Sequence, residues 1–222
     1  MTSNPSWLDT TAYPFTPKTF TAPDGRMSYV DEGEGDVIVM VHGTPTWSFL
    51  YRHLIRDLSA GYRVIAPDNL GFGLSEHPDG YSYRPQDQAR NLTALIDSLN
   101  LPAFTLVVHD FGGPIGLSYA VERPEQIKRL VLLNTWMWSL ADDREKVMVG
   151  RMLGSPLGGF LYRRFGFSAN VILPSAYGDK AKLTPEIHAQ YKAPLATPAE
   201  RESTFAYARA LMDSADWYDG LW

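Results

Sequence analysis

Short apolar runs alternate along the chain with longer amphipathic stretches, and glycine, proline, aspartate and asparagine separate them. The runs Val37–Val41 (VIVMV) and Phe104–Val108 (FTLVV) predict strands that are buried on both faces. Arg63–Ala66 and Ile127–Leu133 predict two more strands. This alternation is typical of βαβ units and predicts an α/β fold with a mostly parallel sheet.

Three amphipathic stretches predict the helices that cover the sheet. They are Ser48–Leu58, Arg84–Leu99 and Gly112–Val121. The first carries Leu50, Leu54 and Leu58 at helical spacing, so we expect these leucines to form its buried face. Ahead of the helices, Lys18–Thr21 and Arg26–Asp31 predict an antiparallel hairpin at a sheet edge.

The sequence changes in character after the strand predicted at Ile127–Leu133. From there it is rich in Trp, Met, Gly and Pro and contains amphipathic helical pieces. We expect residues 1–134 to form the N-terminal part of the core, residues 135–217 a helical cap, and residues 218–222 the start of a return to the core. Such a cap would lie over the carboxyl ends of the strands, where open α/β sheets bind their ligands.

Candidate chemistry lies between a predicted strand and a predicted helix, in the segment VHDFGG (108–113). A nucleophile elbow presents a reactive side chain on a sharp turn between a strand and a helix, and it needs small residues beside that side chain. Gly112 and Gly113 meet this need, which makes Asp110 the candidate nucleophile. The alternative is that Asp110 only caps the helix, because aspartate is a favoured N-cap residue.

Two further loops directly follow predicted strands. In enzymes with an elbow, a backbone N–H of the first loop and that of the residue after the nucleophile form the oxyanion hole, which predicts Thr44 and Phe111 here. In the second loop, Gly71 and Gly73 imitate the start of a dinucleotide-binding motif. Glu76 stands where the third glycine belongs and no helix begins there, which excludes a Rossmann cofactor site.

Composition narrows the possible functions. With 222 residues, of which 45% are hydrophobic, the chain can bury a full core. The net charge of −5 and the absence of a basic run interleaved with aromatics argue against a nucleic-acid partner. The chain has no cysteine, which excludes thiolate chemistry, and we expect no metal and no organic cofactor. No secretory leader or spanning apolar stretch is recognisable, so we expect a cytoplasmic protein with no membrane partner.

Three sequence blocks resemble the haloalkane dehalogenases in order and spacing. They are HGTPTWSFLYR (42–52), PDNLGFGLS (67–75) and VVHDFGGPIGL (107–117). Two later segments, QYKAPLATPAER (190–201) and SADWYDGLW (214–222), resemble the cap of that family. The resemblance spans nearly the whole chain. It implies an α/β-hydrolase fold with helices on both faces of the sheet, a helical cap insertion and missing C-terminal strands.

The resemblance also implies a reaction, the cleavage of carbon–halogen bonds through an ester between Asp110 and the alkyl group. An ionised carboxylate can displace halide from saturated carbon without a base. Water then attacks the ester carbonyl carbon, and this step needs a general base, normally a histidine oriented by a carboxylate. The expected partners are a small apolar halogenated substrate, water and the released halide ion.

The halide-binding positions depart from the family pattern. Members of the family hold the halide with two side-chain N–H donors, commonly a Trp after the nucleophile plus either a cap Trp or an Asn after the HG pair. Here those two motif positions hold Phe111 and Thr44. We regard Trp47, Trp136 and Trp138 as possible pocket residues, and packing in the lid or core is the alternative role for each.

None of the five histidines is expected to be the base. They are His42 in a loop, His53 on a helix, His77 and His188 in packing or surface positions, and His109, which should point away from Asp110. The resemblance places the general base beyond residue 222. Asn134 occupies one of the two positions where the family has the carboxylate that orients this base, so we expect that acid beyond residue 222 as well. We therefore expect a truncated chain that does not sustain turnover and leaves Ile127–Leu133 as an open sheet edge.

Two alternative functions remain open. The first is epoxide hydrolysis, which uses the same aspartyl ester with cap tyrosines as proton donors. Tyr162, Tyr177 and Tyr191 are available in the predicted cap. The second is a non-catalytic ligand-binding protein that keeps the fold and the pocket.

Overall fold

Six strands form one sheet in the order β1-β2-β4-β3-β5-β6 in the computed structural model, which describes residues 4–222. The strands are β1 Lys18–Ala22, β2 Gly25–Glu32, β3 Asp36–Val41, β4 Tyr62–Pro67, β5 Phe104–Asp110 and β6 Ile127–Thr135. β3, β4, β5 and β6 are parallel, whereas β1 and β2 run antiparallel at one side of the sheet. The predicted α/β fold and the N-terminal hairpin are confirmed.

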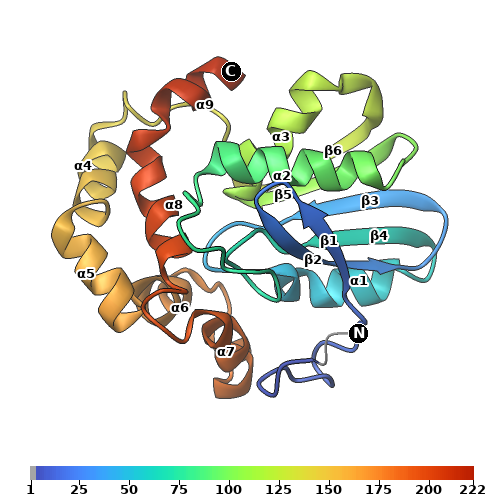
Figure 1. Cartoon of the computed structure of the whole chain (residues 1–222), viewed down its shortest axis with the longest axis horizontal. Helices are drawn as coiled ribbons and strands as arrows, with labels where there is room; N and C mark the ends of the chain where they lie inside the picture. The colour runs from blue at the N-terminus through green and yellow to red at the C-terminus, as the bar shows by residue number, and fades with distance from the viewer. Residues whose placement is uncertain (1–3) are drawn as a thin grey trace.

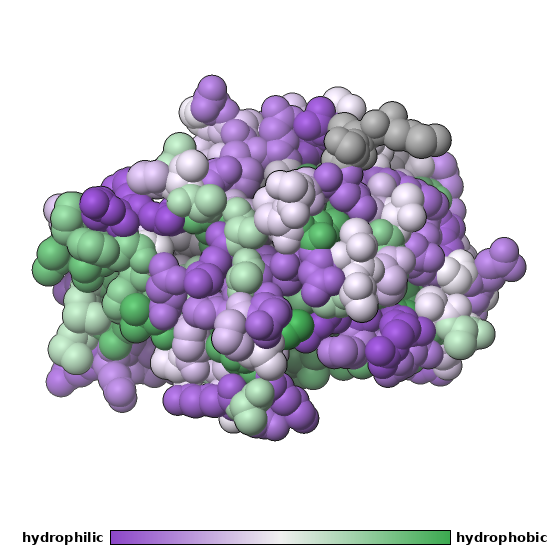
Figure 2. All heavy atoms as spheres, turned by 90° about the horizontal axis from the view of Figure 1, so that it is seen from below, coloured by the Kyte–Doolittle hydropathy of each residue, from purple (hydrophilic) through white to green (hydrophobic). Residues whose placement is uncertain are grey.

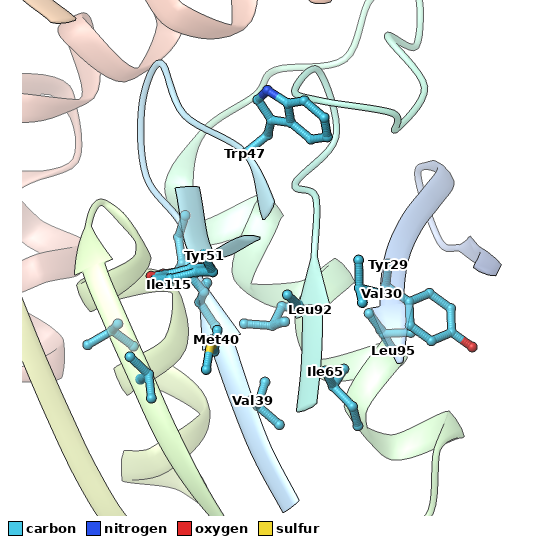
Figure 3. Close-up of a cluster of buried hydrophobic side chains, with 14 of the residues drawn as sticks. Tyr29, Val30, Val39, Met40, Trp47, Tyr51, Ile65, Leu92, Leu95 and Ile115 are labelled. Carbon is cyan, nitrogen blue, oxygen red and sulfur yellow. The ribbon is translucent and has the colours of Figure 1, made fainter. Parts of the chain in front are cut away.

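Helices cover both faces of this sheet. The first three are α1 Arg52–Leu58, α2 Pro85–Ser98 and α3 Gly112–Glu122. α2 and α3 lie together over one face, and α1 lies on the other (Figure 1). The core between the layers contains Val39 and Met40 of β3, Ile65 of β4 and Leu92 and Leu95 of α2, all of them buried (Figure 3).

The buried face of α1 differs from the sequence prediction. Leu54 is 43% exposed and Leu50 and Leu58 are only partly buried, whereas Phe49 and Ile55 are fully buried. The chain forms a 3-10 turn over Ser48–Tyr51 before α1 begins. Because a 3-10 turn has about three residues per turn rather than about 3.6, it shifts the phase of the buried face. The prediction is therefore wrong for Leu54, whereas Leu50 and Leu58 still pack against the core.

Six helices follow β6 and lie at the carboxyl ends of the strands (Figure 1). They are α4 Arg144–Leu153, α5 Pro156–Phe165, α6 Leu173–Ala176, α7 Pro185–Lys192, α8 Glu202–Asp213 and α9 Ala215–Leu221. The boundary predicted after residue 217 falls inside α9, which packs against α3. No helix among residues 4–222 combines the length and apolarity that crossing a bilayer would require.

β6 lies at the end of the strand order, next to β5 alone. Leu130 is 47% exposed and Leu132 is 57% exposed. Among the residues that the structure describes, β6 thus exposes apolar side chains at the edge of the sheet.

Substituting two neighbouring residues of α1 tests the revised buried face. We expect Ile55→Ala to lower the free energy of unfolding by about 2–5 kcal/mol, because it leaves a cavity in the core. The matched control Leu54→Ala removes a half-exposed side chain and should cost less than about 1 kcal/mol. Urea denaturation measures both values. Equal losses, or a larger loss for Leu54→Ala, would contradict the assignment.

Candidate active site

Asp110 occupies a strained turn between β5 and α3. Its φ of +53° is in the left-handed region, which non-glycine residues adopt rarely. The turn is tight because the next residues lie against β3: a Cβ on Gly112 would lie 2.1 Å from the backbone oxygen of Val41. Only glycine fits there. The segment therefore has the geometry of a nucleophile elbow.

The carboxylate of Asp110 is held by two backbone amides. The N–H of Thr44 donates to Oδ1 over 2.8 Å, and the N–H of Phe111 also donates to the carboxylate. A Cβ on Gly43 would lie 2.1 Å from Oδ1, so glycine is required there as well. These two amides are the ones that the sequence predicted for the oxyanion hole. The helix-cap alternative is not supported, because the N-cap position of α3 is Phe111 and no side chain caps it.

Buried polar contacts hold the loop that carries Thr44. Nε2 of His42 accepts the N–H of Asn69 over 2.9 Å, so Nδ1 carries the proton and donates to the oxygen of Gly43 over 2.7 Å. Burial lowers the pKa of His42 to about 4, which keeps the ring neutral. His42 is therefore a positioning residue for the loop.

A second buried aspartate orders the adjacent loop. Asp68 accepts the N–H groups of Ser48 and Leu74 over 2.7 and 2.9 Å. Burial raises the pKa of Asp68 to about 6. Unlike Asp110, it does not line the cavity described below. Asp68, in the block PDNLGFGLS, thus has a structural role.

The end of β6 forms a third side of the site. Thr135 lies opposite Asp110 in the β5–β6 register, and its hydroxyl donates to the backbone oxygen of Asp110 over 2.6 Å. Its neighbour Asn134 has a φ of +39° and also faces the site. Sequence analysis did not identify Thr135. Its position follows only once β6 is known to pair with β5.

A cavity of about 500 Å³ opens in front of Asp110. The strand ends contribute Thr44, Asp110, Phe111, Asn134, Thr135 and Trp136, and the helical segment contributes mainly apolar side chains, among them Leu153, Tyr162, Ile172, Ala208 and Leu211. Such a concave, mostly apolar site with a few convergent polar groups is typical of small-molecule binding. Across residues 4–222, no cluster of His, Cys, Asp or Glu could hold a metal ion.

The three tryptophans predicted for the pocket occupy different environments. Trp136 and Trp138 line the cavity. Trp47 does not: it is buried, and its Nε1 donates to the oxygen of Gln190 over 3.0 Å. The packing alternative therefore applies to Trp47.

Two buried donors beside Asp110 have no hydrogen-bond partner among the described residues. They are Nε1 of Trp136 and the hydroxyl of Thr44, and both residues line the cavity. Trp136 meets the ring of Phe111 edge to face, with ring centroids 4.9 Å apart. Buried polar groups normally have partners, so unsatisfied ones at a cavity indicate a place for a polar ligand atom.

The charge of Asp110 also acts on nearby tyrosines. Burial, followed by the charge of Asp110, raises the pKa of Tyr162 to about 12. The pKa values of Tyr207 and Tyr218 are raised too, mainly by burial, and neither hydroxyl has a partner among the described residues. Of the three cap tyrosines considered for epoxide chemistry, Tyr162 lines the cavity, whereas Tyr177 and Tyr191 do not.

None of the five histidines hydrogen-bonds to Asp110. Apart from His42, His53 is exposed, and His188 bonds through Nε2 to the oxygen of Ala169. His77 and His109 are partly buried, and burial lowers the pKa of both. Each histidine thus lies in a structural or surface position, as the sequence indicated.

A model of the alpha/beta hydrolase fold family matches residues 36–170, a region that includes Asp110 and both predicted oxyanion residues. The match covers more than half of the chain and agrees with the sheet order and the elbow. The chain belongs to the α/β-hydrolase fold family.

Within this family the chain resembles the haloalkane dehalogenases. It is 39% identical to haloalkane dehalogenase 2 of Mycobacterium tuberculosis over 185 residues, which are 83% of this chain and 64% of that relative. It is also 39% identical to the cis-3-alkyl-4-alkyloxetan-2-one decarboxylase of Shewanella oneidensis over 203 residues, 90% of this chain and 64% of that relative. The chain thus spans 64% of the length of both relatives.

Solved structures agree with this resemblance. The haloalkane dehalogenase DatA from Agrobacterium tumefaciens has a TM-score of 0.82 and 28% identity, covering 95% of this chain and 75% of that chain. A putative ancestral haloalkane dehalogenase has a TM-score of 0.83 and 28% identity, covering 92% of this chain and 74% of that chain. The family resemblance predicted from the motifs is confirmed.

The effect of burial on Asp110 is testable through stability. Burial raises the pKa of Asp110 to about 6, whereas an unfolded aspartate titrates near about 3.9. The charged carboxylate therefore destabilises the folded chain above pH ~6, and this cost disappears below pH ~4, where the group is protonated in both states. We expect Asp110→Asn to raise the free energy of unfolding by about 1–2 kcal/mol at pH ~8 and by much less at pH ~4. Urea denaturation at the two pH values measures the difference. A gain independent of pH would contradict the assignment.

Proposed function

We propose that this chain cleaves carbon–halogen bonds by forming an ester between Asp110 and the alkyl group of a haloalkane. The observation that carries the proposal is the carboxylate of Asp110, which lines an apolar cavity while Thr44 and Phe111 fix its orientation. The dehalogenase relatives support the same reaction. The predicted cap, residues 135–217, would enclose the substrate.

The first step needs only the ionised carboxylate. One carboxylate oxygen forms a bond to the saturated carbon that carries the halogen, and the carbon–halogen bond breaks with its electron pair on the halide. Because the cavity is largely apolar, it accepts an alkyl chain and leaves the carboxylate poorly solvated, which increases its nucleophilicity.

The second step is hydrolysis of that ester. Water attacks the carbonyl carbon, and the amides of Thr44 and Phe111 are placed to stabilise the oxyanion. Attack by water needs a general base. The fraction of the chain that carries the ester measures how fast this second step is relative to the first.

The leaving halide needs hydrogen-bond donors that do not already donate to another group. We assign this role to Nε1 of Trp136 and the hydroxyl of Thr44, because both are unpartnered among the described residues and both residues line the cavity. Phe111, at the family's usual tryptophan position, has no side-chain N–H.

Intact mass spectrometry tests the first step. Incubation with a bromoalkane should add one alkyl group to the chain, and peptide mapping should place it on Asp110. Asp68 provides an internal control, because burial raises its pKa to about 6 as it does for Asp110, but Asp68 does not line the cavity. Asp110→Asn should give no adduct. An adduct elsewhere, or one that persists in Asp110→Asn, would reject the mechanism.

The rate of alkylation should depend on pH. Because burial raises the pKa of Asp110 to about 6, the nucleophile is protonated below that value. We expect the rate of adduct formation to rise with pH and to reach half of its maximum near pH ~6. A profile that is flat between pH ~5 and ~8 would mean that another group reacts.

Substitution of Trp136 tests the halide donors. Trp136→Phe retains an aromatic ring but removes the N–H, and we expect the alkylation rate to fall by about 10- to 100-fold, as for a lost hydrogen bond to an anion. Trp138→Phe is the matched control: Trp138 also lines the cavity but is 47% exposed and packs against Trp222. Similar rates for the two variants would remove Trp136 from the mechanism.

A second candidate reaction is the decarboxylation of a cis-3,4-dialkyloxetan-2-one, suggested by the Shewanella oneidensis relative. Asp110 would attack ring carbon 4, and the ring C–O bond would break with its electron pair on the released carboxylate. Loss of CO2 from carbon 3 would then form the carbon–carbon double bond and expel Asp110. The observation that favours this candidate is the 39% identity to that relative over 90% of this chain. The reaction would use the same carboxylate in the same apolar cavity.

Gas chromatography distinguishes the two candidates. If the second applies, the chain should convert the oxetanone to an alkene over many turnovers, and Asp110→Asn should abolish the product. If the first applies, the bromoalkane should label Asp110 and the oxetanone should give no alkene.

A further inference from the structure

Large apolar side chains are exposed on the outer surface of α4 and α5. Met148 and Leu157 are each 67% exposed, Met152 is 61%, Phe160 is 55% and Phe165 is 53%. These helices form the end of the molecule farthest from the sheet (Figure 1), and Figure 2 shows apolar side chains gathered at that end. We call these five residues the cap patch.

The helical phases show that the patch faces away from the protein. On α4, Gly150 packs against Met212 of α8, and Met148 and Met152 lie on the opposite side of the helix. On α5, Gly158, Gly159 and Tyr162 are buried. Leu157 and Phe160 then lie on the outer side, together with Arg164. The exposed side chains thus form a second apolar face, in addition to the one that packs on the cap.

The cap patch is bordered by positive charge. α4 and α5 carry five Arg or Lys residues and one Glu, in a chain of net charge −5. Arg144, Arg151 and Arg164 are exposed and have no ion-pair partner among residues 4–222. The other two basic residues are paired, Lys146 with Asp143 and Arg163 with Glu202.

We propose that the cap patch docks on the surface of an anionic lipid bilayer. Helices that lie in a membrane interface combine large apolar side chains with arginine or lysine beside them. Anionic headgroups would neutralise the unpaired arginines while the apolar side chains enter the acyl boundary. A second copy of the chain is a poorer partner, because a two-fold contact brings the same patch, and hence the same positive charges, together.

The proposal goes beyond the reaction at Asp110 and does not depend on it. It links the two sites, however, because Leu153 of α4 and Tyr162 of α5 line the cavity in front of Asp110. Docking would place the cavity beside a source of apolar substrates. The sequence-based expectation of no membrane partner rested on the lack of a spanning segment, and the proposal revises it to surface contact.

Vesicle sedimentation tests the proposal with the whole chain. We expect the chain to sediment with vesicles of phosphatidylglycerol and phosphatidylcholine, and much less with phosphatidylcholine alone. Added salt should weaken binding, since it screens the arginines. The double variant Leu157→Gln/Phe160→Gln should lower the partition coefficient by at least about tenfold, and Arg151→Gln/Arg164→Gln should lower binding to the anionic vesicles alone.

Val121→Gln is the matched control, because Val121 is 52% exposed on α3, outside the cap patch. Circular dichroism checks that each variant is folded. Lack of binding to anionic vesicles, or equal losses in the control and the patch variants, would overturn the proposal. So would light scattering that shows a dimer abolished by Leu157→Gln/Phe160→Gln, because the patch would then bind a second copy. A bromoalkane adduct on Asp110 is measured separately, so failure of one proposal leaves the other intact.

Discussion

The structure of the site depends on two backbone amides that converge on one buried carboxylate. Thr44 and Phe111 donate to Asp110, and this is possible only because β3 and β5 are neighbours in the sheet, so that the loops following them meet. Gly43 and Gly112 allow that approach, since a Cβ at either position would overlap the other loop. The strained backbone of Asp110 is the local cost of presenting its side chain at the carboxyl end of the sheet.

The carboxylates of Asp68 and Asp110 resemble each other in hydrogen bonding but differ in their access to the cavity. Asp68 and Asp110 each accept two backbone N–H groups, and burial raises the pKa of both to about 6. Asp68 binds the amides of two separate loop segments and does not line the cavity. Asp110 binds the amides that would stabilise an oxyanion, and it lines the cavity. Access to the cavity, rather than pKa or the number of hydrogen bonds, distinguishes the two carboxylates.

The sequence predicted those parts of the molecule that depend on local patterns. Buried strands such as Val37–Val41 and the elbow at Asp110 follow from apolar runs and from small residues at fixed spacing. The buried face of α1 did not follow, because a 3-10 turn changed its phase without a signal in the pattern. Thr135 and Tyr207 were missed because their proximity to the elbow arises from strand pairing and helix packing between distant segments. Helical spacing predicts which side of α8 is buried, but it does not predict that Tyr207 on that side contacts Phe111.

Phe111 stands where the family commonly has a tryptophan, and the surroundings of its ring suit a side chain without an N–H. Phe111 packs between Tyr207, with centroids 4.6 Å apart, and Trp136, at 4.9 Å. A ring without a polar atom suits that position. An indole N–H there would need a hydrogen-bond acceptor, and aromatic rings are weaker acceptors than a carbonyl or an anion. The neighbouring Trp136 has the indole N–H that a phenylalanine cannot supply. This N–H is buried without a partner among the described residues. Trp136 follows β6, and β6 pairs with β5 up to Thr135 opposite Asp110. The strand register therefore places that N–H on the same side of the cavity as Asp110. Phe111 therefore has no side-chain N–H at the motif position, but the end of the neighbouring strand places an unpartnered N–H beside it.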